Sequence, residues 1–411
     1  MMLERKILVV EDSPVVLKVL NHLLSQNAMF VPVLCTCYKE AEGKLSQEEG
    51  FFAAIVDLDL PDAKNGEIVD LVLLNSIPCV VLTGNFDENL RLNLLNKGVL
   101  DYITKDSRYS FNHVIKVIER LSNNQGVKVL VAEDSATSRG FIRTLLEQYR
   151  FDVIEVENGQ EALAKLEEDP DIRMLIADHN IPLVNGYELV RMLRNNTRFQ
   201  DLVIIGLSSE GDSALSAKFI KAGANDFLKK PFYHEEFHCR VVHSLEAQEM
   251  LETIRDLANT DPLTKLKNRR YFFDRGELMF RNATTELALA MLDLDHFKRI
   301  NDTYGHIIGD DLLAAIGREI HDSFPDLLVC RFGGEEFCVM AKMSGQDLLD
   351  RLSVFLERLR LKEFTGAKIS LTCSVGLCCQ PMDSLEELIK MADHYLYQAK
   401  RLGRDQVVSD L

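Results

Sequence analysis

A pair of carboxylates directly follows a pair of glycines in the segment Arg331–Phe337, which reads RFGGEEF. Apolar runs of β type lie on both sides, and paired glycines accept the positive φ of a tight hairpin turn. A hairpin does not need Glu335 and Glu336, and two adjacent like charges slightly destabilise it. Carboxylates beside bare glycine backbone can instead hold a divalent cation close to a ligand. The motif alone favours a plain hairpin over a metal site, and the surrounding chain reverses that preference.

A second acidic strand end lies upstream, where the apolar run Leu287–Leu292 leads into Asp293. If this strand neighbours the hairpin, the acidic ends of the two strands meet. Nearer the C-terminus, Lys400 and Arg404 flank a glycine after a helical pattern, and the helix dipole alone accounts for one of these cations. Together these residues describe a nucleoside triphosphate site. The carboxylates suit Mg²⁺ and the cations suit phosphates, while the asparagine and aspartates of segment 301–311 suit the edge of a base.

The first half of the chain contains one pattern twice, which indicates an internal repeat. Each copy has four short apolar runs of buried-strand type, separated by helical patterns. Strands that alternate with helices predict a doubly wound parallel sheet, whose strand carboxyl ends form one ligand crevice. The runs end in an acidic pair, a lone aspartate, a hydroxyl residue and a lysine: Glu11 with Asp12, Asp57, Thr83 and Lys105 in the first copy, and Glu133 with Asp134, Asp178, Ser208 and Lys230 in the second.

These residue types fit phosphoryl chemistry. Three carboxylates in one crevice repel one another unless a hard cation such as Mg²⁺ joins them. One aspartate can attack a phosphoryl group and form an acyl phosphate. The lysine offsets charge on the phosphoryl oxygens, and the hydroxyl can hydrogen-bond the phosphate and move its loop.

Both copies resemble the receiver domains of two-component response regulators, with agreement at five separated positions in each. The resemblance implies that Asp57 and Asp178 are the phosphoacceptors and that each joins its acidic pair in holding Mg²⁺. It also implies that the hydroxyl residues are switches, that the lysines pair with phosphate, and that Tyr102 and Phe227 are the rotating aromatics. One copy could instead be a structural adaptor that is not phosphorylated.

The third part of the chain, over about residues 255–408, resembles the GGDEF domain of diguanylate cyclases, with five motifs in that family's order. The resemblance implies that Asp293, Glu335 and the backbone carbonyl of Leu294 ligate Mg²⁺. Glu335 is also the candidate base for the 3′-hydroxyl of GTP, and its division of labour with Glu336 stays open. The resemblance further implies that Lys298 stabilises charge on the reacting phosphate. It implies nucleoside contacts by Asn301, His306 and Asp310, with Asn301 and Asp310 reading guanine. Lys400 and Arg404 would contact the terminal phosphates.

Two departures from that family stand out. Asp405 replaces the usual asparagine, and the sequence alone does not indicate what this replacement does. Many members carry an Arg-x-x-Asp product-binding motif before the signature, whereas Phe324 and Leu327 stand at those positions here. We therefore expect the primary inhibitory site for the product to be absent.

We expect an α/β chain of two flavodoxin-like receivers, residues 1–123 and 127–245, followed by an α+β GGDEF domain at 260–411. A long helix over 235–259 joins them, and it can be a plain linker, a dimerising coiled coil, or both. The stretch Ser122–Gly126 is interpreted as a plain polar linker between the receivers.

Bulk composition narrows the class of protein. The 411 residues are 46% apolar and carry a net charge of -17, which argues against a nucleic-acid partner bound by bulk electrostatics. The nine cysteines are interpreted as reduced thiols because their number is odd and most lie in apolar runs. There is neither an apolar signal region nor an apolar run of about 20 residues. We expect a soluble, cytoplasmic protein without membrane insertion.

The function expected from these features is a phosphorylation-regulated diguanylate cyclase in a two-component pathway. It would condense two GTP into cyclic di-GMP and two pyrophosphates. Its partners would be a histidine kinase or phosphotransfer protein and a second copy of the chain, since one cyclase domain cannot place both substrates. The alternatives are a non-catalytic signalling module and a cyclase for a mixed dinucleotide, which Asp310 disfavours.

Overall fold

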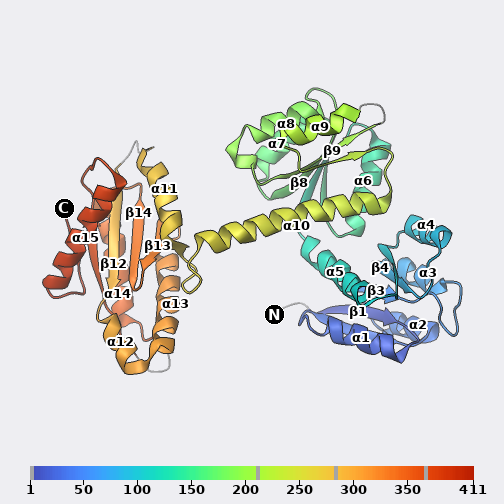
Figure 1. Cartoon of the computed structure of the whole chain (residues 1–411), viewed down its shortest axis with the longest axis horizontal. Helices are drawn as coiled ribbons and strands as arrows, with labels where there is room; N and C mark the ends of the chain where they lie inside the picture. Colours follow the sequence, from blue (N-terminus) through green and yellow to red (C-terminus); the bar gives the residue numbers. More distant parts are fainter. Residues whose placement is uncertain (1–3, 210–212, 282–285, 365–368) are drawn as a thin grey trace. The chain divides into compact units, whose positions relative to one another are not determined.

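The computed structural model describes residues 4–209, 213–281, 286–364 and 369–411. The chain divides into two compact units, Met1–Glu249 and Met250–Leu411. Both receiver repeats lie in the first unit, and the GGDEF-like segment lies in the second (Figure 1).

The first repeat forms a five-stranded parallel sheet in the order β2-β1-β3-β4-β5. Successive side chains of a strand point to opposite faces, so Ile7 packs with helices α1 and α5, whereas Leu8 packs with α2, α3 and α4. The elements are β1 (Arg5–Val10), α1 (Pro14–Leu24), β2 (Phe30–Cys35), α2 (Tyr38–Gln47), β3 (Phe51–Val56), α3 (Glu67–Leu74), β4 (Cys79–Thr83), α4 (Glu88–Lys97), β5 (Asp101–Thr104) and α5 (Arg108–Asn124).

The second repeat forms its own parallel sheet in the order β10-β9-β8-β6-β7. Its elements are β6 (Lys128–Ala132), α6 (Ala136–Gln148), β7 (Asp152–Val156), α7 (Gly159–Glu168), β8 (Ile172–Asp178), α8 (Gly186–Arg194), the 3₁₀ helix η1 (Thr197–Phe199), β9 (Val203–Ser208), α9 (Ser213–Ala222), β10 (Asp226–Lys229) and α10 (His234–Asn259). The two doubly wound parallel sheets confirm the predicted fold class of the repeats.

The interpretation of Ser122–Gly126 as a plain polar linker holds only in part, because Ser122 to Asn124 belong to helix α5, whereas Gln125 and Gly126 form an exposed turn before β6. Helix α5 continues to Asn124, which is fully buried, and the Asn124 side-chain amide donates to the carbonyl of Tyr149 at 2.9 Å. A polar side chain can be buried when its donor is paired. Polar composition alone therefore does not show where α5 ends and the linker begins.

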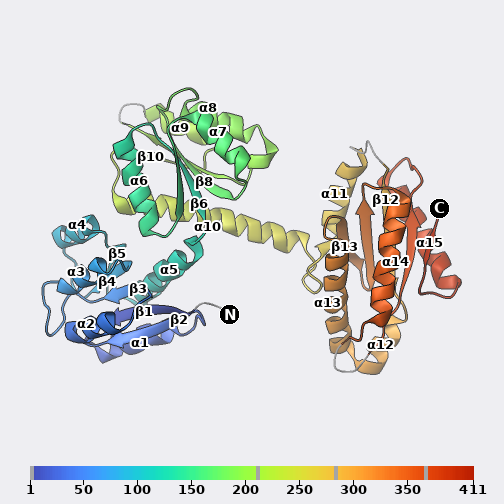
Figure 2. The ribbon, with the colours of Figure 1, turned by 180° about the vertical axis from the view of Figure 1, so that it is seen from behind.

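The second unit contains a six-stranded mixed sheet in the order β11-β13-β14-β12-β15-β16. Figure 2 shows helices on both sides of this sheet, with α13 and α14 on one side and α15 on the other. The elements are β11 (Lys267–Asn268), α11 (Arg269–Arg281), β12 (Ala288–Leu294), α12 (Phe297–Tyr304), α13 (His306–Ser323), β13 (Leu328–Gly333), β14 (Glu336–Ala341), α14 (Gly345–Leu361), β15 (Cys373–Cys378), α15 (Leu385–Arg401) and β16 (Val407–Ser409).

Helix α10 changes character along its length. Phe237, Val241 and Leu245 are buried in the core of the second repeat. Farther along, Ile254 and Leu257 are 51% and 74% exposed. The apolar residues of α10 thus divide into a core segment and an exposed segment.

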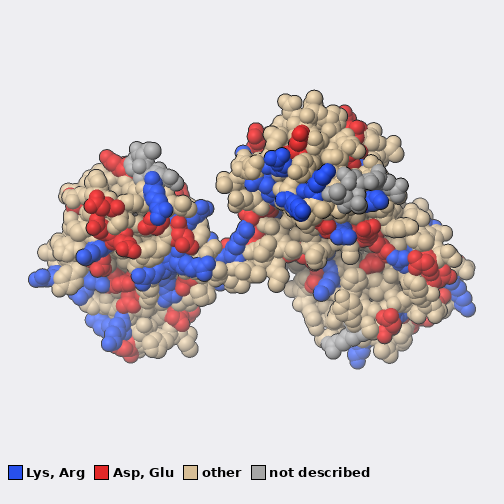
Figure 3. Space-filling view, turned by 45° about the horizontal axis from the view of Figure 1, so that its top comes forward, with Lys and Arg blue, Asp and Glu red and all other residues tan. Residues whose placement is uncertain are grey.

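The cysteines, the surface charges and the helix lengths bear on what the composition predicts. All nine cysteines are free thiols. Charges of both signs are interspersed on the face shown in Figure 3. Among the described residues, no helix has the length and apolar character needed to cross a membrane.

Candidate functional sites

The strand ends of the first receiver bring its predicted residues together. Lys105 Nζ lies 2.7 Å from Glu11 Oε2 and 2.6 Å from Asp57 Oδ2. Oxygens of Glu11, Asp12 and Asp57 lie within 4.8 Å of one another, although Asp12 is exposed. Burial raises the pKa of Glu11, and Lys105 opposes that effect. Clustered carboxylate oxygens of this kind suit a hard divalent cation.

The predicted switch residues of this receiver also connect. Thr83 is buried at the end of β4, and its hydroxyl oxygen accepts from the Asn85 backbone N–H at 3.4 Å. The Tyr102 hydroxyl donates to the carbonyl of the same Asn85 at 2.8 Å, and the Tyr102 side chain is buried. One loop residue therefore links the predicted hydroxyl switch to the predicted aromatic.

The second receiver repeats this arrangement with differences in detail. Lys230 Nζ donates to Asp178 Oδ1 at 2.6 Å and also bonds Glu133. Burial alone would lower the pKa of Lys230, but these two carboxylates outweigh it and raise the pKa. Asp134 is exposed and, within the described chain, does not complete a compact cluster with the other two acids.

The predicted switch pair of the second receiver lies at the same edge of its sheet. The Ser208 carbonyl accepts from the Lys230 backbone N–H at 2.7 Å, and the Ser208 side chain is buried. The Phe227 ring packs 5.3 Å from the ring of Phe219 on α9.

The two acidic strand ends of the GGDEF-like domain are neighbours, as the sequence predicts. In the antiparallel pair β12 and β14, Asp293 stands opposite Glu336. The Leu294 backbone N–H donates to the Glu335 carbonyl at 3.3 Å. Burial and neighbouring carboxylates raise the pKa values of Asp293 and Glu336. Lys400 Nζ lies 2.7 Å from Asp293 Oδ2 and partly offsets this charge.

The RFGGEEF segment forms the predicted hairpin between β13 and β14, with Gly334 at a φ of +53°. Arg331 closes the turn, because its Nε donates to the Gly334 carbonyl at 2.9 Å. The same guanidinium contacts both carboxylate oxygens of Asp261 at 3.1 and 3.2 Å. The signature turn is thus tied to the segment that follows α10.

The predicted nucleoside and phosphate residues lie on α12, α13 and the end of α15. Asn301 Oδ1 would lie only 1.9 Å from a Cβ at Gly309, so glycine permits this close packing. Asp310 follows Gly309 on α13 and is exposed, as are Lys298 and His306. Arg404 is exposed just beyond α15.

Sequence reasoning missed one acidic residue. Asp295, one residue beyond β12, is 4% exposed and accepts hydrogen bonds from Thr372 Oγ1 at 2.8 Å and Ser374 Oγ at 2.6 Å. The only signal in the sequence is the segment Asp293-Leu294-Asp295, because residues two apart in an extended chain point to the same face of the sheet.

The two residues at the positions of the product-binding motif, Phe324 and Leu327, belong to the hydrophobic core. Phe324 is fully buried, and its ring lies 5.6 Å from that of Phe355. Leu327 packs against the same core. Asp326 is exposed and pairs with Arg351 at 2.8 Å.

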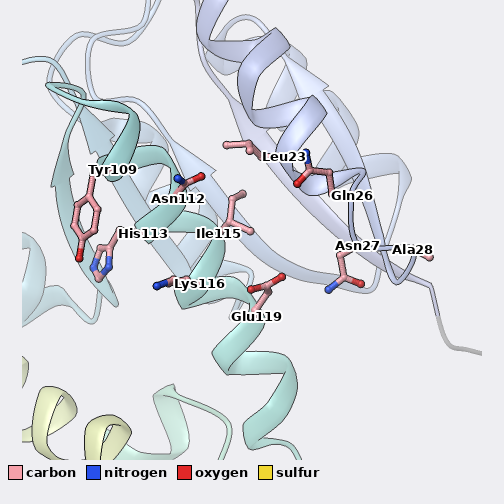
Figure 4. Close-up of a pocket in the computed structure, with 10 residues that line it drawn as sticks. All are labelled: Leu23, Gln26, Asn27, Ala28, Tyr109, Asn112, His113, Ile115, Lys116 and Glu119. Carbon is pink, nitrogen blue, oxygen red and sulfur yellow. The ribbon is translucent and has the colours of Figure 1, made fainter. Parts of the chain in front are cut away.

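A groove of about 550 Å³ lies between α1 and α5 in the first receiver (Figure 4). Its lining includes Asn27, Asn112 and Lys116, and none of the predicted site residues is among the lining residues. The groove therefore does not include the predicted phosphorylation site at the strand ends.

Comparisons with known proteins follow the same division. The response regulator receiver domain family matches residues 7–118 and 129–242, and the diguanylate cyclase GGDEF domain family matches residues 258–406. Response regulator PleD of Caulobacter vibrioides is 28% identical over 377 residues, covering 81% of this chain and 82% of PleD. A solved response regulator/GGDEF domain protein is 41% identical, with a TM-score of 0.54, covering 60% of this chain and 100% of the solved chain.

Other relatives match a shorter part of the chain. Diguanylate cyclase DgcP of Pseudomonas aeruginosa is 39% identical over 166 residues, which cover 38% of this chain and 25% of DgcP. Cyclic di-GMP phosphodiesterase PdeR of Escherichia coli is 36% identical over 174 residues, which cover 41% of this chain and 26% of PdeR.

Two receiver domains ahead of a GGDEF domain define a response regulator with an enzymatic output. The chain belongs to the response regulator family, and its output domain is a diguanylate cyclase.

Proposed function

We propose that the protein is a phosphorylation-regulated enzyme that condenses two GTP into cyclic di-GMP and two pyrophosphates. The observation that carries the proposal is the pairing of Asp293 with Glu336 across neighbouring strands, with Lys400 on the Asp293 carboxylate. This places acidic and basic groups side by side, as a metal–triphosphate substrate requires.

The donor set of the cyclase site fits Mg²⁺. Asp293, Glu335 and the Leu294 carbonyl would hold the ion, and oxygen ligands are the ones that Mg²⁺ prefers. When bound, the ion would neutralise charge on the phosphate oxygens. In the receivers, the acidic pairs with Asp57 and Asp178 are the candidate Mg²⁺ ligands, and the clustered oxygens of Glu11, Asp12 and Asp57 support this for the first receiver.

Each 3′-hydroxyl would attack the α-phosphate of the GTP held by the other cyclase domain. One P–O bond forms at that phosphorus while the bond to the β-phosphate oxygen breaks, and pyrophosphate leaves. Glu335 is the candidate acceptor for the hydroxyl proton, and Lys298 is the candidate partner for charge on the reacting phosphate. Asn301 and Asp310 would read guanine beside His306, while Lys400 and Arg404 would hold the terminal phosphates.

Two copies must meet for this reaction, and the exposed segment of α10 supports a contact between copies. Met250, Leu251, Ile254 and Leu257 are all at least half exposed there. Such an apolar stripe on a helix is typical of a coiled-coil contact. Introducing Glu at both Ile254 and Leu257 should lower specific activity at protein concentrations where the wild type is dimeric. An unchanged dependence of activity on protein concentration would contradict this contact.

The regulatory part of the proposal is that a histidine kinase or phosphotransfer protein supplies the phosphoryl group to Asp57 or Asp178. The lysine contacts at both aspartates support it. Phosphorylation would move the loops of Thr83 or Ser208 and shift the population of active dimers.

The test of the activity is product identification. The full chain is incubated with GTP, ATP and Mg²⁺, and the dinucleotides are separated and identified, with Glu336→Ala as the control. Cyclic di-GMP from the wild type, strongly reduced in Glu336→Ala, is the expected result. A mixed dinucleotide would indicate a different base specificity, and GTP binding without product would indicate a non-catalytic signalling module.

A further inference from the structure

The buried carboxylate of Asp295 binds the loop that carries Arg404. Besides Thr372 and Ser374, Asp295 accepts a hydrogen bond from the Asp405 backbone N–H at 3.1 Å. Its side chain is only 1% exposed. A buried carboxylate is unfavourable unless it is hydrogen-bonded, so its donors are held in a defined geometry.

The loop itself has an unusual backbone. Gly403, Arg404 and Asp405 are consecutive residues with φ values of +120°, +66° and +48°. Residues other than glycine adopt positive φ at a cost in free energy, and such conformations persist only where the surroundings hold them. The turn that presents Arg404 therefore depends on tertiary contacts.

A second contact comes from helix α14. Arg360 Nε lies 3.0 and 2.8 Å from the two carboxylate oxygens of Asp405, and Arg360 Nη2 donates to the Asp405 carbonyl at 2.8 Å. One guanidinium thus holds both the side chain and the backbone of the residue after Arg404. An asparagine at this position would offer one acceptor oxygen and no charge.

We propose that Asp295 and the Arg360–Asp405 ion pair are positioning residues that hold turn 403–405, so that Arg404 reaches the terminal phosphates of GTP. The proposal rests on the cyclase function proposed above. It gives Asp405 a role in this chain, because its carboxylate recruits Arg360 to the turn as a second side-chain contact beside Asp295.

Nucleotide binding by the full chain tests the proposal with Asp405→Ala and Arg360→Ala. Because GMP lacks the terminal phosphates, the Kd for GTP should rise by roughly five- to tenfold while the Kd for GMP stays unchanged, which for tenfold corresponds to ~1.4 kcal/mol. Asp405→Asn should raise the Kd for GTP less than Asp405→Ala does, because asparagine tolerates positive φ and keeps one acceptor oxygen for Arg360 but loses the charge.

Arg351→Ala is the matched control. Arg351 is on the same helix and pairs with Asp326 at 2.8 Å, away from turn 403–405. This variant should bind GTP like the wild type. Equal weakening of GTP and GMP binding by Asp405→Ala, or no weakening of GTP binding, would overturn the proposal.

A double-mutant comparison tests Asp295 through Arg404. Asp295→Asn and Arg404→Ala should each raise KM for GTP, and the double variant should be no worse than Arg404→Ala, because Asp295 acts through Arg404. Multiplying effects would contradict this. If Asp295→Asn does not fold, the surface variants of Arg360 and Asp405 decide. If the wild type binds GTP but forms no cyclic di-GMP, the proposed function fails while the binding comparison still tests the positioning role.

Discussion

Lys400 Nζ lies 2.7 Å from Asp293 Oδ2, which joins a predicted phosphate ligand to a predicted metal ligand in one ion pair. The Asp293 side chain is 11% exposed and that of Lys400 is 32% exposed. Each receiver has a similar pair, Lys105 with Asp57 and Lys230 with Asp178. In all three sites a lysine offsets a carboxylate at a strand end, and the same lysine can contact a phosphate.

Replacing Lys400 should weaken substrate binding. We expect Lys400→Met to raise KM for GTP by about tenfold, or ~1.4 kcal/mol. The Asp293 side chain is only 11% exposed and loses its cation in this variant, so the melting temperature should also fall, and KM is measured at a temperature where the variant is folded. Steady-state kinetics with Lys390→Met as the control measures the effect, because Lys390 is exposed on the same helix α15. A KM like that of the wild type would exclude Lys400 from phosphate binding.

Glu336 should favour activity at the expense of stability. Burial and Asp293 raise its pKa above the usual 4.5, so the charged form is destabilised in the folded protein. Removing the charge in Glu336→Gln should stabilise the protein by about 0.2–1 kcal/mol at neutral pH, as for like charges facing across strands, while activity falls.

The pH dependence of that gain follows from the sign of the shift. Because the pKa of Glu336 is raised in the folded state, acidification protonates Glu336 in the folded protein before it does so in the unfolded chain. Protonation removes the unfavourable charge from the wild type. The stability difference between Glu336→Gln and wild type should therefore shrink as pH falls through the folded pKa of Glu336. Denaturation with urea at several pH values measures it, and a difference that grows on acidification would contradict the assignment.

The sequence predicts those parts of this site that depend on signals from residues close together along the chain, and it does not predict contacts that depend only on residues far apart along the chain. Glycine pairs and strand-end carboxylates are local signals, and the hairpin at Gly334 and the meeting of Asp293 with Glu336 follow from them. Asp295 was missed because its donors, Thr372 and Ser374, are far along the chain. The partner of Asp405, Arg360, is 45 residues away. Pairings of this kind depend on tertiary packing.

Polar composition was also misleading at one place. The segment around Asn124 has the polar residues of a linker, yet Asn124 itself is helical and buried, with its amide paired to a carbonyl. By contrast, the two parallel sheets follow from strand-end residues that recur in the same order. Repetition made the fold class predictable where single motifs would not have done so.

His238 should make the first unit sensitive to mild acid. It is buried against Tyr149, with ring centroids 3.8 Å apart, and burial lowers its pKa from 6.5 to about 3. Below pH 6.5 the unfolded chain takes up a proton that the folded chain does not. Stability should therefore fall by up to about 1.4 kcal/mol for each pH unit between 6.5 and the folded pKa.

His238→Phe should remove that contribution, because phenylalanine can stack on Tyr149 and does not titrate. Thermal unfolding at pH 7 and pH 5 compares it with His243→Phe, whose parent histidine is exposed on the same helix. The difference between the two pH values should shrink in His238→Phe alone. A wild-type slope in that variant would be evidence against this role.

Product inhibition through the primary site should be absent. Phe324 and Leu327 contribute to the core, so they offer no charged group to a dinucleotide. Initial rates with added cyclic di-GMP should be unchanged at submicromolar product. Inhibition at such levels that disappears in Asp326→Ala would refute the prediction.

The central claim is that receiver phosphorylation controls cyclic di-GMP synthesis, and one measurement tests it most directly. The rate of cyclic di-GMP formation from GTP and Mg²⁺ is compared with and without a small-molecule phosphoryl donor, in wild type and in Asp57→Asn with Asp178→Asn. We predict that the donor raises the wild-type rate and leaves the double variant at its basal rate. Equal rates in both proteins, with and without the donor, would contradict the account.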